Sequence, residues 1–148
     1  TPPARVYPHA IPGRQIVKLK VTGEDLWELA ENGVSCFPAE DGRFPSVSGM
    51  AFGFRPSLPK GGRVEWLTVG GTPVARDSDA MFTLATSTYL AAGKEGADCL
   101  EDCERLIDDE FGPQTQTCVV DGLKALTADS GGVFSAPPIE GRVVNLEE

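Results

Sequence analysis

The sequence contains very little histidine. His9 is the only histidine in 148 residues, so this chain cannot build a dinuclear metal centre, which needs several histidine and aspartate ligands. The same lack argues against nucleophilic catalysis, because Ser-His-Asp and Cys-His arrangements both need a histidine beside the nucleophile. A structural zinc site is also disfavoured, since there is no CxxC motif. The chain alone is therefore not expected to be an enzyme.

Basic side chains are also scarce. Lysine and arginine number 13 against 22 acidic residues, which gives a formal net charge of −9. Proteins that bind nucleic acids need clustered lysine and arginine to neutralise phosphates, so a nucleic-acid partner is excluded. Six of the carboxylates fall within residues 101–110. For this acidic run we favour a solvated helix face over a cation site.

Long hydrophobic runs are missing as well. No apolar stretch approaches the roughly 18 residues that a membrane-spanning helix needs, so no membrane span is predicted. Residues 1–14 are rich in proline and predict an extended lead-in, and the opening Thr-Pro-Pro-Ala resembles a processed start rather than a signal peptide. The length of 148 residues, with 41% hydrophobic and 24% charged side chains, suits a single globular domain over residues 1–148.

Four cysteines are present, and their number is even. An even count in a short acidic chain favours two disulfides and an oxidising compartment, although three connectivities remain open and four free thiols are the alternative. Two of these cysteines lie four residues apart, so a helix would place them on one face. The candidates are Cys36, Cys99, Cys103 and Cys118.

The hydrophobic periodicity predicts an α+β domain. Residues 15–21 alternate as a strand, and Thr22 with Asp25 forms a capping-box pair that begins a helix. The Asn-Gly pair at residues 32–33 ends that helix. Further strands are predicted at 47–54, 63–69, 81–86 and 142–146, with helices around residues 100–107 and after Thr117.

Residues 81–97 organise the chain, because a strand, a short helical turn and a glycine loop follow one another there. Glycines allow the backbone of the loop at residues 93–96 to approach a ligand. Glycines are equally common in ordinary turns that bind no ligand, and both interpretations stay open. Lys94 and Glu95 within this loop are expected to be solvated charges rather than ligand contacts.

In this order, the segments resemble the C-terminal domain of the 5′-nucleotidase family, which includes UDP-sugar hydrolases, 2′,3′-cyclic phosphodiesterases and ecto-5′-nucleotidases. The resemblance spans nearly the whole chain. The matching stretches are residues 17–26 (VKLKVTGEDL), 31–35 (ENGVS), 42–50 (GRFPSVSGM), 63–64 (RV), 69–74 (VGGTPV), 83–93 (TLATSTYLAAG) and 137–143 (PPIEGRV).

This resemblance implies a single α+β domain with a mixed β-sheet and packed helices. In the family, a separate N-terminal metallophosphatase domain holds two metal ions and performs the chemistry, so no cofactor is expected in this chain. The C-terminal domain holds the nucleobase between two aromatic rings and swings to deliver the phosphate. Stacking suits this task because every base has a π-face.

The resemblance also identifies candidate substrate-binding residues. Phe44 stands at the position of the first stacking aromatic, next to Arg43, whose guanidinium suits phosphate geometry. From the residues alone, Phe44 equally well fills the core, and Arg43 pairs with a surface carboxylate. Ser87 stands where the family has an asparagine.

The family's Gly-Gly-Asp-Gly loop corresponds to residues 93–96, in which Gly93 and Gly96 are glycine as in the family. The second stacking aromatic directly follows that loop. Ala97 occupies its position here, and an alanine methyl group cannot stack on a purine.

Two functional hypotheses follow. The first is a domain that recognises a nucleoside or nucleotide for a 5′-nucleotidase-like hydrolase, with a metallophosphatase domain or another protein chain as its partner. The alternative is a structural or interaction module in an extracellular assembly that has lost nucleotide binding, as Ala97 suggests. Both hypotheses place the protein outside the cytoplasm, as a secreted, cell-surface or periplasmic protein.

Overall fold

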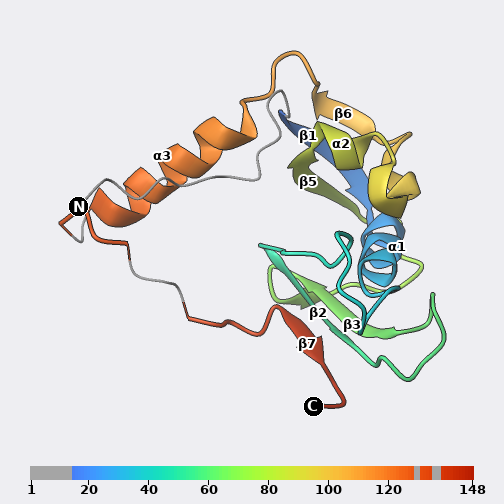
Figure 1. Cartoon of the computed structure of the whole chain (residues 1–148). Coiled ribbons are helices and arrows are strands. Elements are labelled where there is room, and N and C mark those ends of the chain that lie inside the picture. The colour runs from blue at the N-terminus through green and yellow to red at the C-terminus, as the bar shows by residue number, and fades with distance from the viewer. Residues whose placement is uncertain (1–14, 129–130, 135–137) are drawn as a thin grey trace.

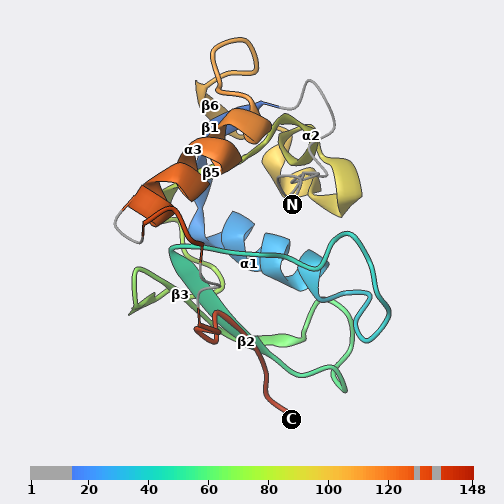
Figure 2. The same cartoon turned by 60° about the vertical axis from the view of Figure 1, so that its left-hand side comes forward.

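The computed structural model describes residues 15–128, 131–134 and 138–148. The expected lead-in at residues 1–14 and the first residue of the 137–143 motif lie outside these ranges. Two β-sheets enclose α1, which lies between them in both views (Figures 1 and 2). The strand orders are β5-β1-β6 in the three-stranded sheet and β4-β3-β2-β7 in the four-stranded sheet. The predicted α+β class is confirmed, with the strands divided between two sheets.

The elements follow one another in a mixed order. Two short 3₁₀ turns, Lys94–Gly96 and Asp98–Leu100, lie between α2 and β6. The bounds are β1 Ile16–Thr22, α1 Gly23–Gly33, β2 Met50–Phe54, β3 Val64–Val69, β4 Thr72–Pro73, β5 Met81–Ser87, α2 Thr88–Ala91, β6 Glu104–Ile107, α3 Thr115–Ala128 and β7 Val143–Asn145.

The junction between β1 and α1 forms as the sequence predicts. Val17, Leu19 and Val21 alternate along β1 and are fully buried. At the start of α1, the Asp25 amide donates to Thr22 Oγ1 at 3.1 Å, and the Thr22 amide donates to the Asp25 carboxylate at 2.7 Å. Both halves of the capping box are therefore present, and they fix the direction in which α1 leaves the sheet.

The four-stranded sheet contains both antiparallel and parallel pairs. β2 pairs with β3 in antiparallel fashion and with β7 in parallel, where Phe52 lies opposite Val143. The small residues predicted on one face of β2 make room for an aromatic ring: a Cβ built on Gly53 would clash with the Trp66 indole. Phe52 and Phe54 on the other face are buried and form the core beside α1.

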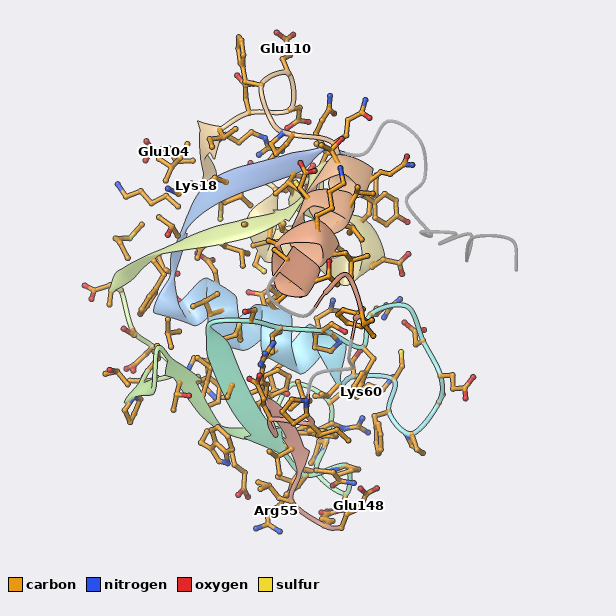
Figure 3. All side chains as sticks on the ribbon, turned by 90° about the vertical axis from the view of Figure 1, so that its left-hand side faces the viewer. Lys18, Arg55, Lys60, Glu104, Glu110 and Glu148 are labelled. Atoms are coloured by element: carbon orange, nitrogen blue, oxygen red, sulfur yellow. The ribbon has the colours of Figure 1, made fainter. Side chains whose placement is uncertain are left out.

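The helix predicted around residues 100–107 is wrong. After the 3₁₀ turn at Asp98–Leu100 the chain extends into β6, which pairs with the edge of β1. The Arg105 side chain holds β6 in place by donating to the Ala91 carbonyl at 3.0 Å. β6 is an edge strand of this sheet, and the labelled Glu104 and Glu110 side chains point outward from β6 and from the turn that follows it (Figure 3).

Helix α3 begins two residues before the predicted Thr117 cap. It projects from the body of the molecule (Figure 1), and its described residues include no buried side chain. Its apolar side chains Val119, Val120 and Leu126 are all exposed.

The expected disulfides are absent. All four cysteines lie among the described residues, and each is a free thiol: Cys36, Cys99, Cys103 and Cys118. The predicted helical face for Cys99 and Cys103 does not form either, because one lies in a 3₁₀ turn and the other just before β6. Both thiols instead contact Asp25, with Cys99 Sγ 3.7 Å from its carbonyl oxygen and Cys103 Sγ 3.9 Å from its carboxylate.

The Cys99 thiol makes the free energy of unfolding depend on pH in the alkaline range. Burial, and to a smaller degree the charges of Glu28 and Asp25, raise the pKa of its thiol from 9.0 to about 12. The folded state therefore holds this proton more tightly than the unfolded chain. The resulting stability is fully present below pH 9 and is lost as the pH rises toward 12.

We expect the difference in unfolding free energy between the wild type and Cys99→Ala to shrink as the pH is raised through this window. Urea titrations at about pH 7.5, 9 and 10.5 measure that difference, with Cys118→Ala at an exposed position as the control. A difference that stays constant from pH 7.5 to 10.5 would contradict the prediction.

Candidate functional site

A cavity of about 630 Å³ opens beside the end of α1, and we call it the Phe44 cavity. Six parts of the chain meet there: the last turns of α1, the loop at residues 42–48, the start of β2, β5, α2 and the segment at residues 95–97. Its lining is Leu29, Asn32, Gly42, Arg43, Phe44, Pro45, Ser46, Val47, Ser48, Met50, Thr83, Leu84, Ala85, Thr86, Leu90, Glu95 and Ala97.

Phe44 is held at this cavity by a tight turn and by other rings. Its amide donates to the Asp41 carbonyl at 3.2 Å. Its ring centroid lies 6.1 Å from that of Phe37 and 6.4 Å from that of Phe54, an edge-on contact. Nevertheless, 45% of Phe44 remains exposed. The ring therefore rests against the core and still has surface available to a ligand.

The loop that carries Phe44 is anchored by Arg63. Its guanidinium donates to the carbonyls of Val34 at 2.6 Å, Ser35 at 3.2 Å and Phe37 at 2.9 Å. These bonds satisfy carbonyls that the end of α1 leaves without helical partners. The loop then returns against α1 at Gly33, where an added Cβ would lie 2.8 Å from Pro45.

The buried carboxylate of Glu31 stabilises the region around Arg63. Glu31 is 6% exposed and accepts from the amides of Arg63 at 2.9 Å and Val64 at 3.1 Å, and from the Arg76 guanidinium at 2.6 Å. The sequence analysis missed this network. Its only sequence signal is that Glu31 lies four residues after Trp27 and so shares the buried side of α1.

Arg43 lines the cavity, and its charge is already partnered. Its Nε lies 3.6 Å from the Asp41 carboxylate. The Arg43 amide donates to the same carboxylate at 3.0 Å. This amide bond, followed by the Arg43 charge, lowers the pKa of Asp41 from 3.8. The predicted pairing of Arg43 with a surface carboxylate is thus present, and Arg43 also lines the cavity, while its contact with a phosphate remains a prediction.

The wall formed by β5 and residue 97 contains no aromatic ring. β5 contributes residues 83–86, and α2 contributes Leu90. Ala97, at the position of the second stacking aromatic in the resemblance, is 1% exposed. Phe44 is therefore the one aromatic side chain among the described lining residues of this cavity.

Glu95, which belongs to the glycine loop and was expected to be solvated, lines the cavity. Gly93 and Gly96 adopt positive φ angles of 71° and 74°, and Glu95 between them has φ 57°. Asn32 Nδ2 donates to the Glu95 carbonyl at 2.8 Å, and the Tyr89 hydroxyl donates to Glu95 Oε1 at 3.0 Å. Glu95 is thus a fixed part of the cavity lining rather than a mobile surface charge.

The structure therefore divides the predicted site residues into two groups. Arg43 and Phe44 line the cavity, whereas Ser87, Gly93 and Gly96 are not among its lining residues. Ser87 caps α2, because its Oγ accepts from the Leu90 amide at 3.3 Å. The two glycines shape the loop: a Cβ on Gly96 would lie 2.7 Å from Asn32 Oδ1.

The described part of the chain offers no place for a metal ion. No three His, Cys, Asp or Glu side chains group there in a way that would hold one. In the same ranges, no helix has both the length and the apolar character required to cross a membrane.

Comparisons with known proteins agree with the fold. Residues 6–102 match the family described as 5′-nucleotidase, C-terminal domain. The trifunctional nucleotide phosphoesterase protein YfkN of Bacillus subtilis is 25% identical over 134 residues, which cover 88% of this chain and 9% of that protein. The chain is thus a small fraction of that relative's length.

Solved structures give the same result. The 5′-nucleotidase precursor from Thermus thermophilus superimposes with a TM-score of 0.75 at 29% identity, covering 92% of this chain and 26% of that one. The NAD nucleotidase of Haemophilus influenzae shares the fold, with a TM-score of 0.64 at 16% identity over 89% of this chain and 24% of its own. Because the family match covers more than half of the sequence, the chain belongs to the 5′-nucleotidase C-terminal domain family.

Proposed function

We propose that this domain recognises the base of a nucleoside or nucleotide substrate for a 5′-nucleotidase-type hydrolase. The observation that carries the proposal is Phe44, a core-supported ring that is 45% exposed and lines a cavity of about 630 Å³. Such a volume suits a ligand of nucleoside size. Family membership supports the same role, and the relatives' names describe nucleotidases and a nucleotide phosphoesterase.

The chemistry of hydrolysis belongs, in this proposal, to a separate metallophosphatase domain. The contribution of the described residues is to bind and orient the substrate. Phe44 stacks on the base, and the aliphatic wall of β5 and Leu90 covers its other face. Arg43 lies at the cavity beside Asp41, where its guanidinium is available to a sugar hydroxyl or phosphate.

We also propose that the protein acts outside the cytoplasm, as a secreted, cell-surface or periplasmic protein. This proposal is supported by the Thermus thermophilus relative, which is described as a 5′-nucleotidase precursor. The free thiols of this chain add no support.

Calorimetric titration of the purified chain with AMP, GMP, adenosine and UDP-glucose tests the recognition role. We expect binding of at least one ligand in the micromolar range, about −8 kcal/mol. Phe44→Ala should weaken it by about 1–3 kcal/mol, because a stacked base contributes that much. Phe111→Ala is the matched control, since Phe111 is 81% exposed and does not line the cavity.

A second candidate function is that of an interaction module without a ligand. The exposed apolar side chains of α3 and the alanine at residue 97 favour it. Absence of heat with all four ligands, in a sample that unfolds cooperatively, would reject base recognition by this chain and favour the interaction module.

A further inference from the structure

Glu95 has a strained backbone. Among the described residues it is the only one other than glycine with a positive φ, at 57°. A side chain at such an angle crowds the following carbonyl, so this conformation persists only when its surroundings impose it. Two contacts impose it here, one from Asn32 to the backbone carbonyl and one from Tyr89 to the carboxylate.

The carboxylate of Glu95 lies next to the turn that carries Phe44. Its Oε2 is 3.8 Å from the position that a Cβ on Gly42 would occupy, and both residues line the Phe44 cavity. Oε1 is the atom that accepts from Tyr89. An ionised carboxylate has about four acceptor positions and no donor, so lone pairs on both oxygens stay available to a ligand.

We infer that Glu95 selects guanine among the bases, an inference that rests on the proposed function. A base stacked on Phe44 presents its edge rather than its face to the surrounding polar groups. Guanine carries two adjacent donors on its Watson–Crick edge, the N1–H and the N2 amine. A carboxylate accepts from both at once, in a charge-assisted bidentate pair.

Adenine does not fit the same group. Its edge presents the N6 amine beside the unprotonated N1, an acceptor that would face a carboxylate oxygen without a proton between them. Cytosine has the same pattern, with N3 as the acceptor. A site built to receive two donors rejects a ligand that lacks one of them, because its own polar group is then left unpaired.

Titration with GMP, IMP, AMP and CMP tests the inference, since these ligands share the ribose phosphate and differ in the base. We expect GMP to bind most tightly. IMP keeps the N1–H and loses the N2 amine, and should bind about tenfold more weakly; AMP and CMP should bind about a hundredfold more weakly.

Glu95→Gln separates recognition from a merely structural role. The glutamine amide offers one acceptor and one donor, which match N6 and N1 of adenine, so the preference should invert from GMP toward AMP. Lys94→Gln, at an exposed neighbour outside the cavity lining, should keep the wild-type order.

The outcomes are distinct. Equal or tighter binding of AMP than GMP by the wild type would overturn the inference and leave base recognition intact. The same conclusion would follow if Glu95→Gln weakened the binding of GMP and of AMP by the same factor. Binding of none of the four would overturn the proposed function and the inference together.

Discussion

Glu31→Ala is expected to lower the free energy of unfolding by about 3 kcal/mol or more. The carboxylate is 6% exposed and is the acceptor for the amides of Arg63 and Val64 and for the guanidinium of Arg76. Removing it leaves two backbone donors without their acceptor and takes the carboxylate away from Arg76, whose side chain is 48% exposed. Each unsatisfied donor costs roughly 1–3 kcal/mol, so most of the loss comes from the two amides.

Glu65→Ala is the matched control. Glu65 pairs with Arg55 at 2.6 Å, the same distance as the Glu31–Arg76 pair, but its side chain is 40% exposed compared with 8% for Glu31. An exposed pair contributes about 0–1 kcal/mol, so this variant should remain close to the wild type. Urea unfolding of both variants measures the difference. Similar losses in the two would show that burial of Glu31 does not set its contribution.

Ala97→Phe is expected to tighten nucleotide binding by about 1–3 kcal/mol, a factor of roughly 5 to 150, because it adds a second stacking surface. Ala97 lines the cavity on the wall that has no aromatic ring. A base now held by Phe44 and aliphatic side chains would then lie between two rings. The measurement is calorimetric titration of the wild type and the variant with the same nucleotide.

Ala92→Phe is the control for this substitution, because Ala92 is exposed and does not line the cavity. It adds the same ring nearby and should leave the affinity unchanged. Since Ala97 is buried, cooperative unfolding of Ala97→Phe must be verified first, as overpacking costs about 1–3 kcal/mol. A folded Ala97→Phe protein with unaltered affinity would contradict the placement of the base against this wall.

The sequence predicts those elements whose signals are local. The capping box of Thr22 and Asp25 and the alternation along β1 depend on neighbouring residues, and both form as expected. Phe44 and Arg43 were found through the resemblance, and the structure places both at the cavity.

The parts that could not be predicted depend on contacts between distant residues. Glu31 and Arg63 hold the Phe44 loop through bonds that span about 30 positions. Residues 104–107 have helical spacing, yet they form β6 because the open edge of β1 accepts a strand. Pairing between cysteines likewise depends on the tertiary fold, and the predicted disulfides do not form.

The most direct test of base recognition is to locate the bound nucleotide by NMR. With AMP or GMP added to the ¹⁵N-labelled chain, we expect amide shifts to concentrate at residues 42–48, 83–86 and 95–97, around the Phe44 cavity. In Phe44→Ala the same shifts should need roughly 5 to 150 times more nucleotide, in line with a loss of about 1–3 kcal/mol. Shifts that fall instead along α3, or no shifts with either nucleotide in a folded sample, would contradict the assignment of this cavity as a base-binding site.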